Sequence, residues 1–423
     1  MAATEAPLQR SSSLRPVAGE RAARPTRSGP RVRLQVRLHR LVAAVRRALT
    51  EGFARRTSLR GERHAGARVF GLVGGLLMGS GASAIELPED RGDAMYHLYD
   101  GGGVEAQGPA LLVRKSIADK VSLSASYYVD MVSNASIDVV TTASPYKETR
   151  TEYGAGADYV YRNARMTLSG SSSKEPDYQA DAVNVDVAQE VFGGMTTVNL
   201  GFTRASDEVG KKDSPEFSET ASHWRYRVGV TQILTPRWLA SVNSEAISDD
   251  GYLGSPYRSA LVYGASVPER VPSTRSSRAV KFRTIGEVGS YGAAFADYRY
   301  YWDTWGIRAH TMGVGFSRYF GDNLLADAYL RYHTQGAALF YSDNASTETV
   351  YISRNRQLST FSSIGPSVKV SYRARQVPGS YEIRLNGAYE FLSFSFDDFT
   401  DVRTGTPYSY TAHVLQLFVT AKF

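Results

Sequence analysis

Apolar and polar residues alternate along most of the chain after Ile85. In Val121–Met131, every second residue is Val, Leu, Ala, Tyr, Val or Met, while Ser, Tyr and Asp fill the positions between them. Tyr381–Phe391 and the chain end, Leu415–Phe423, follow the same pattern, and we find no amphipathic helix after Ile85. A period of two predicts strands with one apolar face and one polar face.

The alternation alone fits a soluble β-sandwich as well as a membrane barrel. Three further features favour the barrel. The alternating segments have about ten residues, the length that a tilted strand needs to cross a bilayer. Short connections such as "RNA" and "TPR" alternate with long polar ones such as "GKKDSPEFSETAS". Tyr and Trp gather near segment ends, as in "ADYRYYWDTWG", where interfacial aromatic girdles form.

A barrel in lipid must close, because an open edge leaves backbone groups unpaired in hydrocarbon. We therefore expect the last strand, which ends at Phe423, to pair with the first, Asp93–Tyr99, which the turn Asp100–Gly103 follows. The connections indicate about sixteen strands, within a range of fourteen to eighteen, since Ala293–Phe320 is hard to divide. The predicted fold class is all-β: a transmembrane, antiparallel, up-and-down β-barrel.

The N-terminal part of the chain has a different composition. Val69–Met78 is an apolar run that small residues follow up to Ala84, so 61–84 is predicted to be a signal peptide. Residues 1–60 form an Arg-rich extension, interpreted as disordered and as the product of a start codon assigned too early. The alternative for this extension is a basic amphipathic segment at a membrane surface. Residues 85–423 form the predicted barrel.

Composition narrows the choice of function. The formal net charge is +7, but the basic excess lies in residues 1–84 and the remainder is slightly acidic. Overall charge therefore gives no support for nucleic-acid binding. The chain has no cysteine, which excludes disulfides, thiol nucleophiles and cysteine metal sites.

Several stretches resemble a bacterial family known as domain of unknown function 3570. They are "AMYHLYDGGGVEAQGPALLVRK" (Ala94–Lys115), Ser126–Tyr153, "DGYLGSPYR" (Asp250–Arg258) and "DTWGIRAHT" (Asp303–Thr311). The resemblance covers nearly all of the chain after the leader. It implies an outer-membrane barrel of Gram-negative bacteria, and it implies no activity, substrate or catalytic residue.

The polar faces of the predicted strands carry charged residues of both signs. One interpretation is a charged pathway that selects anionic solutes. The other, which we favour, is that acids and bases pair across strands and fill the lumen, as in any such barrel. The candidate lumen residues are Asp130, Asp186, Arg225, Arg227, Lys281, Arg283, Asp297, Arg299, Lys369, Arg373, Glu382, Arg384 and Glu390.

An enzymatic role has little support in the sequence. The chain contains no GxSxG, HExxH or phosphate-loop motif. A barrel hydrolase would need an acid or a nucleophile beside a histidine, and Asp303 with His310, or Asp249 and Asp250, are the candidates. The "DGGG" stretch precedes a strand, so a hairpin turn explains it better than a phosphate site. We expect no catalytic residue, cofactor or metal.

The sequence thus predicts an integral outer-membrane barrel, exported across the inner membrane, that acts as a pore for small solutes. The alternative is a non-conducting surface scaffold that docks a periplasmic or lipoprotein partner. The loop Gly254–Ser276 is the candidate plug of the lumen. Phe423 is the candidate signal to the barrel assembly machinery. The expected contacts are outer-membrane lipid, that machinery and a small solute, with no nucleic acid.

Overall fold

The computed structural model describes residues 85–134, 136 and 146–423, and most of them lie in strands. The strands are β1 (Arg91–Gly101), β2 (Val104–Ala118), β3 (Val121–Asn134), β4 (Tyr146–Tyr161), β5 (Ala164–Lys174), β6 (Tyr178–Val191), β7 (Thr196–Gly210), β8 (Ser218–Thr235), β9 (Trp238–Gly251), β10 (Ser259–Val262), β11 (Ala265–Pro268), β12 (Thr274–Val288), β13 (Gly292–Asp303), β14 (Arg308–Phe320), β15 (Leu324–Gln335), β16 (Phe361–Val377), β17 (Tyr381–Asp401) and β18 (Thr406–Lys422). Two short 3₁₀ turns, η2 (Phe192–Gly194) and η3 (Arg356–Leu358), lie between strands.

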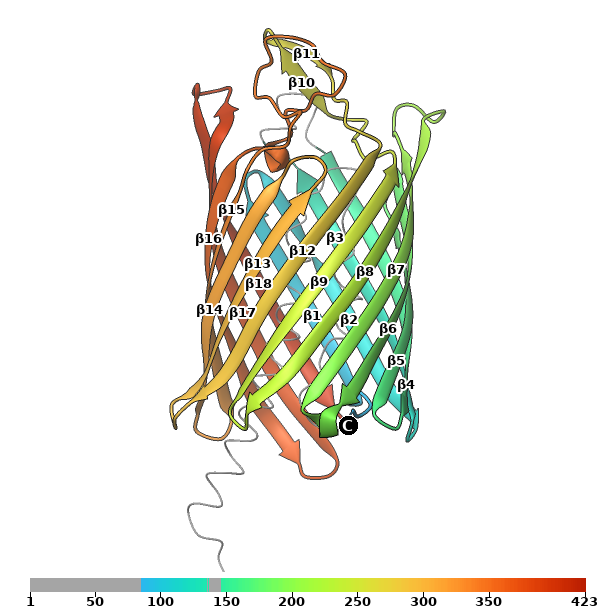
Figure 1. The fold of residues 1–423 in the computed structure, drawn as a ribbon, viewed down its shortest axis with the longest axis vertical. Coiled ribbons are helices and arrows are strands. Elements are labelled where there is room, and N and C mark those ends of the chain that lie inside the picture. Colours follow the sequence, from blue (N-terminus) through green and yellow to red (C-terminus); the bar gives the residue numbers. More distant parts are fainter. Residues whose placement is uncertain (1–84, 135, 137–145) are drawn as a thin grey trace, which may run out of the picture. The chain divides into compact units, whose positions relative to one another are not determined.

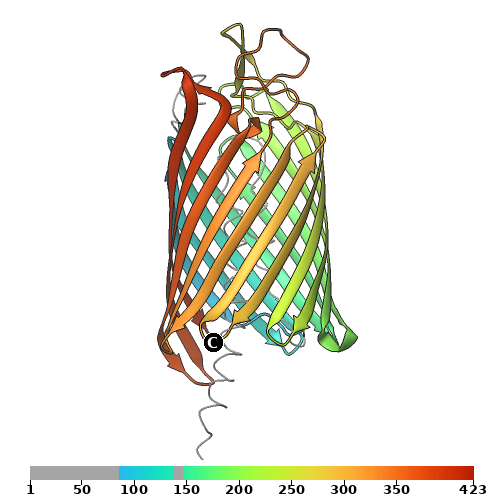
Figure 2. The same ribbon diagram turned by 60° about the vertical axis from the view of Figure 1, so that its left-hand side comes forward.

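Sixteen of the described strands form one closed antiparallel barrel (Figures 1 and 2). Strands that follow each other in sequence are paired, except that β9 pairs with β12. The last strand closes the barrel on the first: β18 pairs with β1 from Lys422 opposite Arg91 to Ala412 opposite Gly101. β10 and β11 are absent from the barrel and form a separate two-stranded sheet. The predicted fold class is confirmed.

The two faces of the wall differ as the alternation requires. In β3, Leu123, Tyr127 and Met131 are exposed on the outside, whereas Ser122 and Asp130 are buried on the inside. The other strands repeat this pattern, with exposed Val, Leu, Phe and Tyr on the outer face. Such an outer face suits acyl chains, so each strand matches its apolar side to lipid and its polar side to the lumen.

The two ends of the barrel carry different connections. Turns of a few residues join β2 to β3, β4 to β5, β8 to β9 and β16 to β17 at the end where the C-terminus lies, which we call the turn end (Figure 1). The longest described connections, 252–273 and 336–360, lie at the opposite end, the loop end. The difference follows the rule for outer-membrane barrels.

Two segments that were hard to assign from sequence are clear in the structure. Ala293–Phe320 divides into β13 and β14, joined by a four-residue connection, Thr304–Ile307. The "DGGG" stretch is a hairpin turn in which Gly102 and Gly103 both have positive φ, as tight hairpins require. Among the described residues, no helix is long and apolar enough to span a membrane.

Candidate functional site: the barrel lumen

All the residues predicted to line the lumen lie on the inner face of the wall. Along each strand they alternate with residues of the outer face, many of which are exposed and apolar. The structure therefore brings them to one surface, but it distributes them over several local networks. These networks differ in burial and in charge, as the following paragraphs describe.

Asp130 belongs to a buried network on the wall formed by β1, β3 and β4. His97 Nε2 lies 2.6 Å from Asp130 Oδ1 and 3.0 Å from the Tyr128 hydroxyl, which itself donates to Asp130 at 3.0 Å. Arg150 Nη1 approaches Asp130 Oδ2 to 4.0 Å, and Arg150 also pairs with Glu152. All five side chains are buried. Their mutual contacts satisfy charges that burial would otherwise penalise.

Asp186 and Arg227 form an ion pair that crosses an entire strand. Asp186 is on β6 and Arg227 on β8, and Gly201 of β7 lies between them in register. Arg227 Nη2 donates to both carboxylate oxygens of Asp186, at 2.9 and 3.1 Å. A Cβ atom at Gly201 would lie 2.3 Å from Asp186 Oδ1. The pair can lie flat on the wall only because residue 201 has no side chain.

A second crossing of this kind fixes Asp297. The Tyr329 hydroxyl of β15 donates to both oxygens of Asp297 on β13, at 3.1 and 3.2 Å. It passes over Gly313 of β14, where a Cβ atom would lie 1.9 Å from the hydroxyl oxygen. Lys281 Nζ lies 3.9 Å from Asp297 on the other side. Arg283 occupies the position directly opposite Asp297 in register.

The wall around Asp297 is rich in cations. Lys281 and Arg299 are directly opposite each other on β12 and β13. Arg331 of β15 lies two strands from Asp297, with Gly313 of β14 between them in register. Arg299 Nη2 is 4.0 Å from Glu245 Oε1. The Arg299 and Glu245 side chains keep 37% and 29% of their accessible surface, so both face open space inside the barrel.

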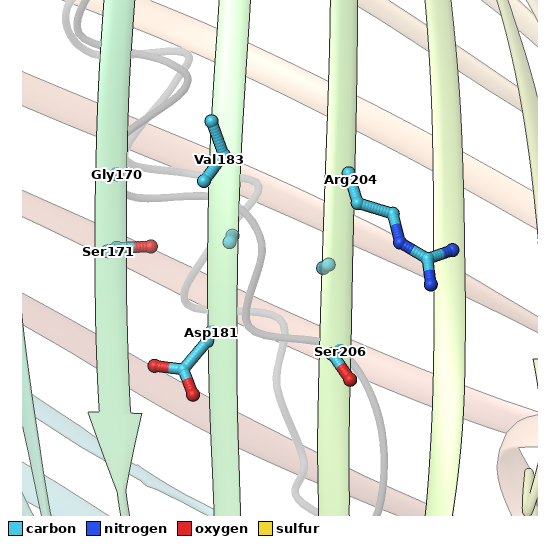
Figure 3. A pocket seen from close by; sticks show the side chains of 8 residues that line it. Gly170, Ser171, Asp181, Val183, Arg204 and Ser206 are labelled. Carbon is cyan, nitrogen blue, oxygen red and sulfur yellow. The ribbon is translucent and has the colours of Figure 1, made fainter.

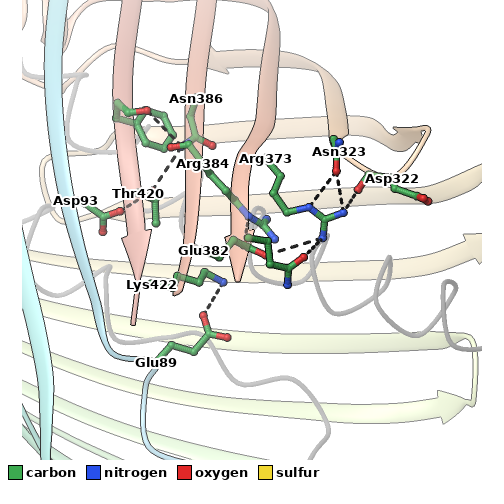
Figure 4. Close-up of polar contacts among 12 residues, drawn as sticks. Glu89, Asp93, Asp322, Asn323, Arg373, Glu382, Arg384, Asn386, Thr420 and Lys422 are labelled. Atoms are coloured by element: carbon green, nitrogen blue, oxygen red, sulfur yellow. Dashed lines mark hydrogen bonds and ion pairs between the residues drawn. The ribbon is translucent and has the colours of Figure 1, made fainter. Parts of the chain in front are cut away.

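Several of the remaining predicted residues lie closer to the turn end or beside the seam between the first and last strands. Arg373 donates to Asn323 and to the carbonyl of Asp322, and Arg384 pairs with Glu382 (Figure 4). At the seam, Thr420 donates to Asp93 at 2.6 Å, and Lys422 Nζ lies 2.7 Å from Glu89 (Figure 4). This network ties β16, β17, β18 and β1 together at the turn end. The other inner-face residues of the prediction are Arg225, Lys369 and Glu390.

An aromatic wall near the loop end was not predicted. Inner-face side chains of β1, β2, β3, β16, β17 and β18 form one buried hydrophobic cluster there. Its members are Tyr99, Val104, Val132, Phe361, Leu392, Phe394, Phe396, Phe399, Tyr408, Ala412 and Val414. The sequence signal was present as exceptions to alternation: Val414 and Phe418 are apolar residues on the polar face of the last strand.

The connection between β15 and β16 packs against this wall. The Arg356 guanidinium lies 5.2 Å from the ring centroid of Tyr410 and 5.6 Å from that of Tyr408, and it is almost fully buried. Arg354 lies 4.4 Å from the Phe399 ring, and it donates to the carbonyl oxygens of Asp343 (2.8 Å) and Thr400 (2.7 Å). The segment carrying η3 therefore reaches the inner face at the mouth.

The same connection forms a cap with the β10–β11 hairpin. Backbone bridges join Val262 to Ala345 and Arg270 to Ile352, and Ile352 is fully buried in the cap. Tyr341 donates to the carbonyl oxygen of Asp398 at 2.9 Å. Burial, followed by the nearby Asp398 and Asp343, raises the pKa of Tyr341 far above its usual range, so the hydroxyl keeps its proton.

The segment predicted to plug the lumen, Gly254–Ser276, is not the one that reaches the inner wall. The hairpin from the predicted plug, Gly254–Ser276, lies beyond the strand ends (Figures 1 and 2), and residues 274–276 belong to β12. The segment that touches the inner wall comes from the other long connection, 336–360. Loop length and polarity could not separate the two, because the contact depends on Arg354 and Arg356 meeting an aromatic wall that the sequence did not indicate.

The family model described as "Protein of unknown function (DUF3570)" matches residues 135–220 and 210–387, more than half of the chain. The chain belongs to this family. The matched residues include Asp250–Arg258 and Asp303–Thr311, which confirms the resemblance seen there, whereas Ala94–Lys115 lies outside the match. No curated protein matches the chain.

Solved structures similar to this DUF3570 barrel include three bacterial proteins. The siderophore receptor PirA from Pseudomonas aeruginosa is 9% identical with a TM-score of 0.40, and the match covers 80% of this chain and 81% of that one. A bacterial polysaccharide outer membrane secretin is 6% identical (TM-score 0.45; 79% and 99% covered). A Pseudomonas aeruginosa FadL homologue is 10% identical (TM-score 0.39; 80% and 90% covered). Likeness at this level supports no inference about what the DUF3570 barrel binds.

Among the residues considered for hydrolysis in the DUF3570 barrel, Asp303 and His310 do not meet, whereas Asp249 contacts a histidine, His223. His310 points outward, with Nδ1 2.7 Å from the Tyr298 hydroxyl, whereas Asp303 points inward and accepts from Arg275 Nε at 2.8 Å. Asp249 points inward and pairs with His223 at 2.8 Å, but its neighbour Asp250 points outward. In residues 85–134, 136 and 146–423, no group of three or more metal-ligating side chains is placed to hold an ion.

A shallow depression of about 360 Å³ lies over β5, β6 and β7 (Figure 3). Gly170, Asp181, Val183, Arg204 and Ser206 border it from the outer face of their strands. None of the residues that line it belongs to the charged networks of the lumen described above.

Proposed function

We propose that this DUF3570 protein is an outer-membrane pore through which small hydrophilic solutes pass. The observation that carries the proposal is the partial exposure of charged inner-face side chains at Arg299 and Glu245. Charged groups inside a barrel keep accessible surface where space for water adjoins them. A sixteen-stranded barrel is in the size range in which porins hold an aqueous channel.

The charge arrangement limits which solutes suit such a pore. Cations concentrate on β12, β13 and β15 around Asp297, whereas Asp130, Glu152 and Asp158 lie on β3 and β4. A solute crossing the lumen meets charges of both signs on different walls. Small zwitterionic or neutral polar solutes suit this arrangement better than ions of one sign.

The proposal includes export and assembly. Residues 61–84 would direct the chain across the inner membrane, and the final strand would engage the assembly machinery before closure. Phe423 supports that role by its position: its backbone N–H donates to the carbonyl oxygen of Asp90 at 3.3 Å, and Lys115 Nζ lies 4.9 Å from its ring. The terminal residue is thus part of the seam.

Conductance tests the pore. The purified full-length protein in planar lipid bilayers is expected to give discrete current steps. The Arg299→Glu variant removes a cation from an accessible site and is expected to shift the reversal potential in a salt gradient toward cation preference. The matched control is Arg318→Glu, on the outer face of β14 at the turn end. A folded wild-type barrel that gives no current would refute the pore.

A second candidate function is a non-conducting scaffold for a partner protein. The observation favouring it is the packed cap, in which Trp305, Ile307, Ala338 and Leu358 form a hydrophobic cluster at the loop end. A cap with its own core provides a stable surface for docking. Replacing 255–272 by a short linker distinguishes the candidates: a scaffold would lose partner capture and would not conduct in either form, whereas a pore would conduct with or without the hairpin. Asp303 and His310 point to opposite faces of the wall, so we do not propose hydrolysis by this pair.

A further inference from the structure

Two arginines flank a tryptophan on the outer face of the barrel near the loop end. Arg278 of β12 is directly opposite Trp302 of β13, and Trp302 is directly opposite Arg308 of β14. All three point outward, because they alternate with the inner residues Ala279, Tyr301 and Ala309 along their strands. The three side chains form a continuous row, Arg–Trp–Arg, which we call the outer arginine row.

The outer arginine row lies at the loop-end edge of the exposed apolar residues of the outer face, which we call the apolar belt. The next outward residues toward the turn end are Val280, Tyr300 and His310, and Phe282 and Met312 follow them. Tyr300 stacks on Trp302 with ring centroids 5.3 Å apart. Toward the loop end, β13 and β14 end within a residue of the row. Trp and Tyr at this level mark the depth of lipid headgroups.

The two guanidinium groups are available to an external ligand. Both arginines are exposed, and neither makes an ion pair or a side-chain hydrogen bond with any residue that the structure describes. The outward acid Asp250 lies opposite Thr274, four residues before Arg278 on β12. Arg204, farther around the same face, differs: its guanidinium lies 4.0 Å from the Trp224 ring and donates to Ser222.

The spacing suits one anionic group between the arginines. β12 and β14 are two strand spacings apart, roughly 10 Å. Arginine side chains extend far enough from both strands to converge on a single phosphate, which guanidinium groups bind through paired hydrogen bonds. A lipid headgroup places its phosphate at the level of the row and its acyl chains on the apolar belt below. A free phosphate in water would gain nothing from that belt.

We propose that the outer arginine row binds the phosphate of a lipid headgroup in the leaflet at the loop end, with Arg278 and Arg308 as the ligating residues. Trp302 and Tyr300 supply the interfacial aromatic surface beside the phosphate. The inference requires the membrane placement of the barrel, but it is independent of the pore. A sealed barrel would bind the lipid equally well.

Lipid binding by the purified full-length barrel in detergent tests the proposal. The probe is lipopolysaccharide, whose lipid carries phosphates on a sugar, and native mass spectrometry or tryptophan fluorescence gives the affinity. The Arg278→Gln/Arg308→Gln variant is expected to bind about 30-fold more weakly, since each arginine near an anionic surface contributes about 1 kcal/mol. Arg318→Gln, on the same face of β14 at the turn end, is expected to bind as the wild type does.

Three results would overturn the proposal. The first is unchanged affinity in the double variant, with folding verified by the heat-dependent shift of the barrel on gels. The second is equal binding of dephosphorylated lipopolysaccharide, which would make the contact purely apolar. The third is displacement of the lipid by millimolar inorganic phosphate, which would identify a site for a free anion in place of a headgroup.

Discussion

The anchoring of the β15–β16 connection to the aromatic wall makes a quantitative prediction. The perturbation is the double substitution Arg354→Ala/Arg356→Ala, which leaves the wall itself intact. Arg354 loses its hydrogen bond to the carbonyl oxygen of Thr400 and its contact with Phe399, and Arg356 loses its contacts with Tyr408 and Tyr410. The contacts of Arg354 with Asp343 lie within the connection and do not contribute to docking. Both side chains are buried in the native protein.

The magnitude follows from these contacts. A hydrogen bond from a charged donor contributes about 1.5–3 kcal/mol, and a desolvated cation–π contact contributes about 2 kcal/mol. After allowance for non-additivity, we expect the double variant to lose about 4 kcal/mol of docking free energy, about a thousandfold in the ratio of docked to released segment.

Limited proteolysis and single-channel recording measure this release. The segment 336–360 of the double variant is expected to be cut much faster than that of the wild type, and the open-channel current is expected to rise. Arg270→Ala is the matched control in the same cap, because Arg270 pairs with Glu348 at an exposed site (43% and 55% accessible). Exposed pairs contribute under about 1 kcal/mol. Equal cleavage rates in the double variant and the wild type would refute the anchoring.

Three further predictions concern the wall and its seam. Gly201→Ala is expected to separate Asp186 from Arg227 and to lower the unfolding free energy by about 1–3 kcal/mol, as measured by urea titration in detergent. The control is Gly387→Ala, which should change the unfolding free energy little because the nearest atom is 3.6 Å from the new Cβ. Lys281→Glu is expected to shift the reversal potential toward cation preference by removing a partner of Asp297, whereas Arg318→Glu on the outer face should not. Removal of Phe423 is expected to slow assembly in cells at unchanged expression, read from the folded fraction on unheated gels, and an unchanged folded fraction would exclude the assembly role.

The period-two pattern was sufficient to predict most of the fold. Alternation is a local property of a strand. The outward position of Leu123 and the inward position of Asp130 could therefore be predicted without knowing which strands pair with β3. Closure followed from the energetics of unpaired backbone in lipid. The division of Ala293–Phe320 was uncertain because the connection Thr304–Ile307 is short and apolar, with Trp305 packed inward.

The lumen was predictable by face but not by partner. Arg227 reaches Asp186 over an intervening strand, and such a pair depends on register and on Gly201, which no sequence pattern gives. The aromatic wall was not predicted because its members come from six strands, each contributing only one to four residues. Val414, an apparent irregularity in the last strand, is one of those members. Apolar residues on the polar face of a predicted strand therefore indicate a hydrophobic cluster inside the barrel.

The glycines beneath the crossing side chains have a consequence for how such barrels change over time. Strand number fixes the circumference of the backbone, whereas the bore that a solute meets depends on how far side chains stand out from it. At Gly201 and Gly313, the side chains of Arg227 and Tyr329 lie flat against the inner wall. A single substitution at either position would push that side chain toward the axis and narrow the bore. Barrels with the same strand count can thus differ in the width of their lumen.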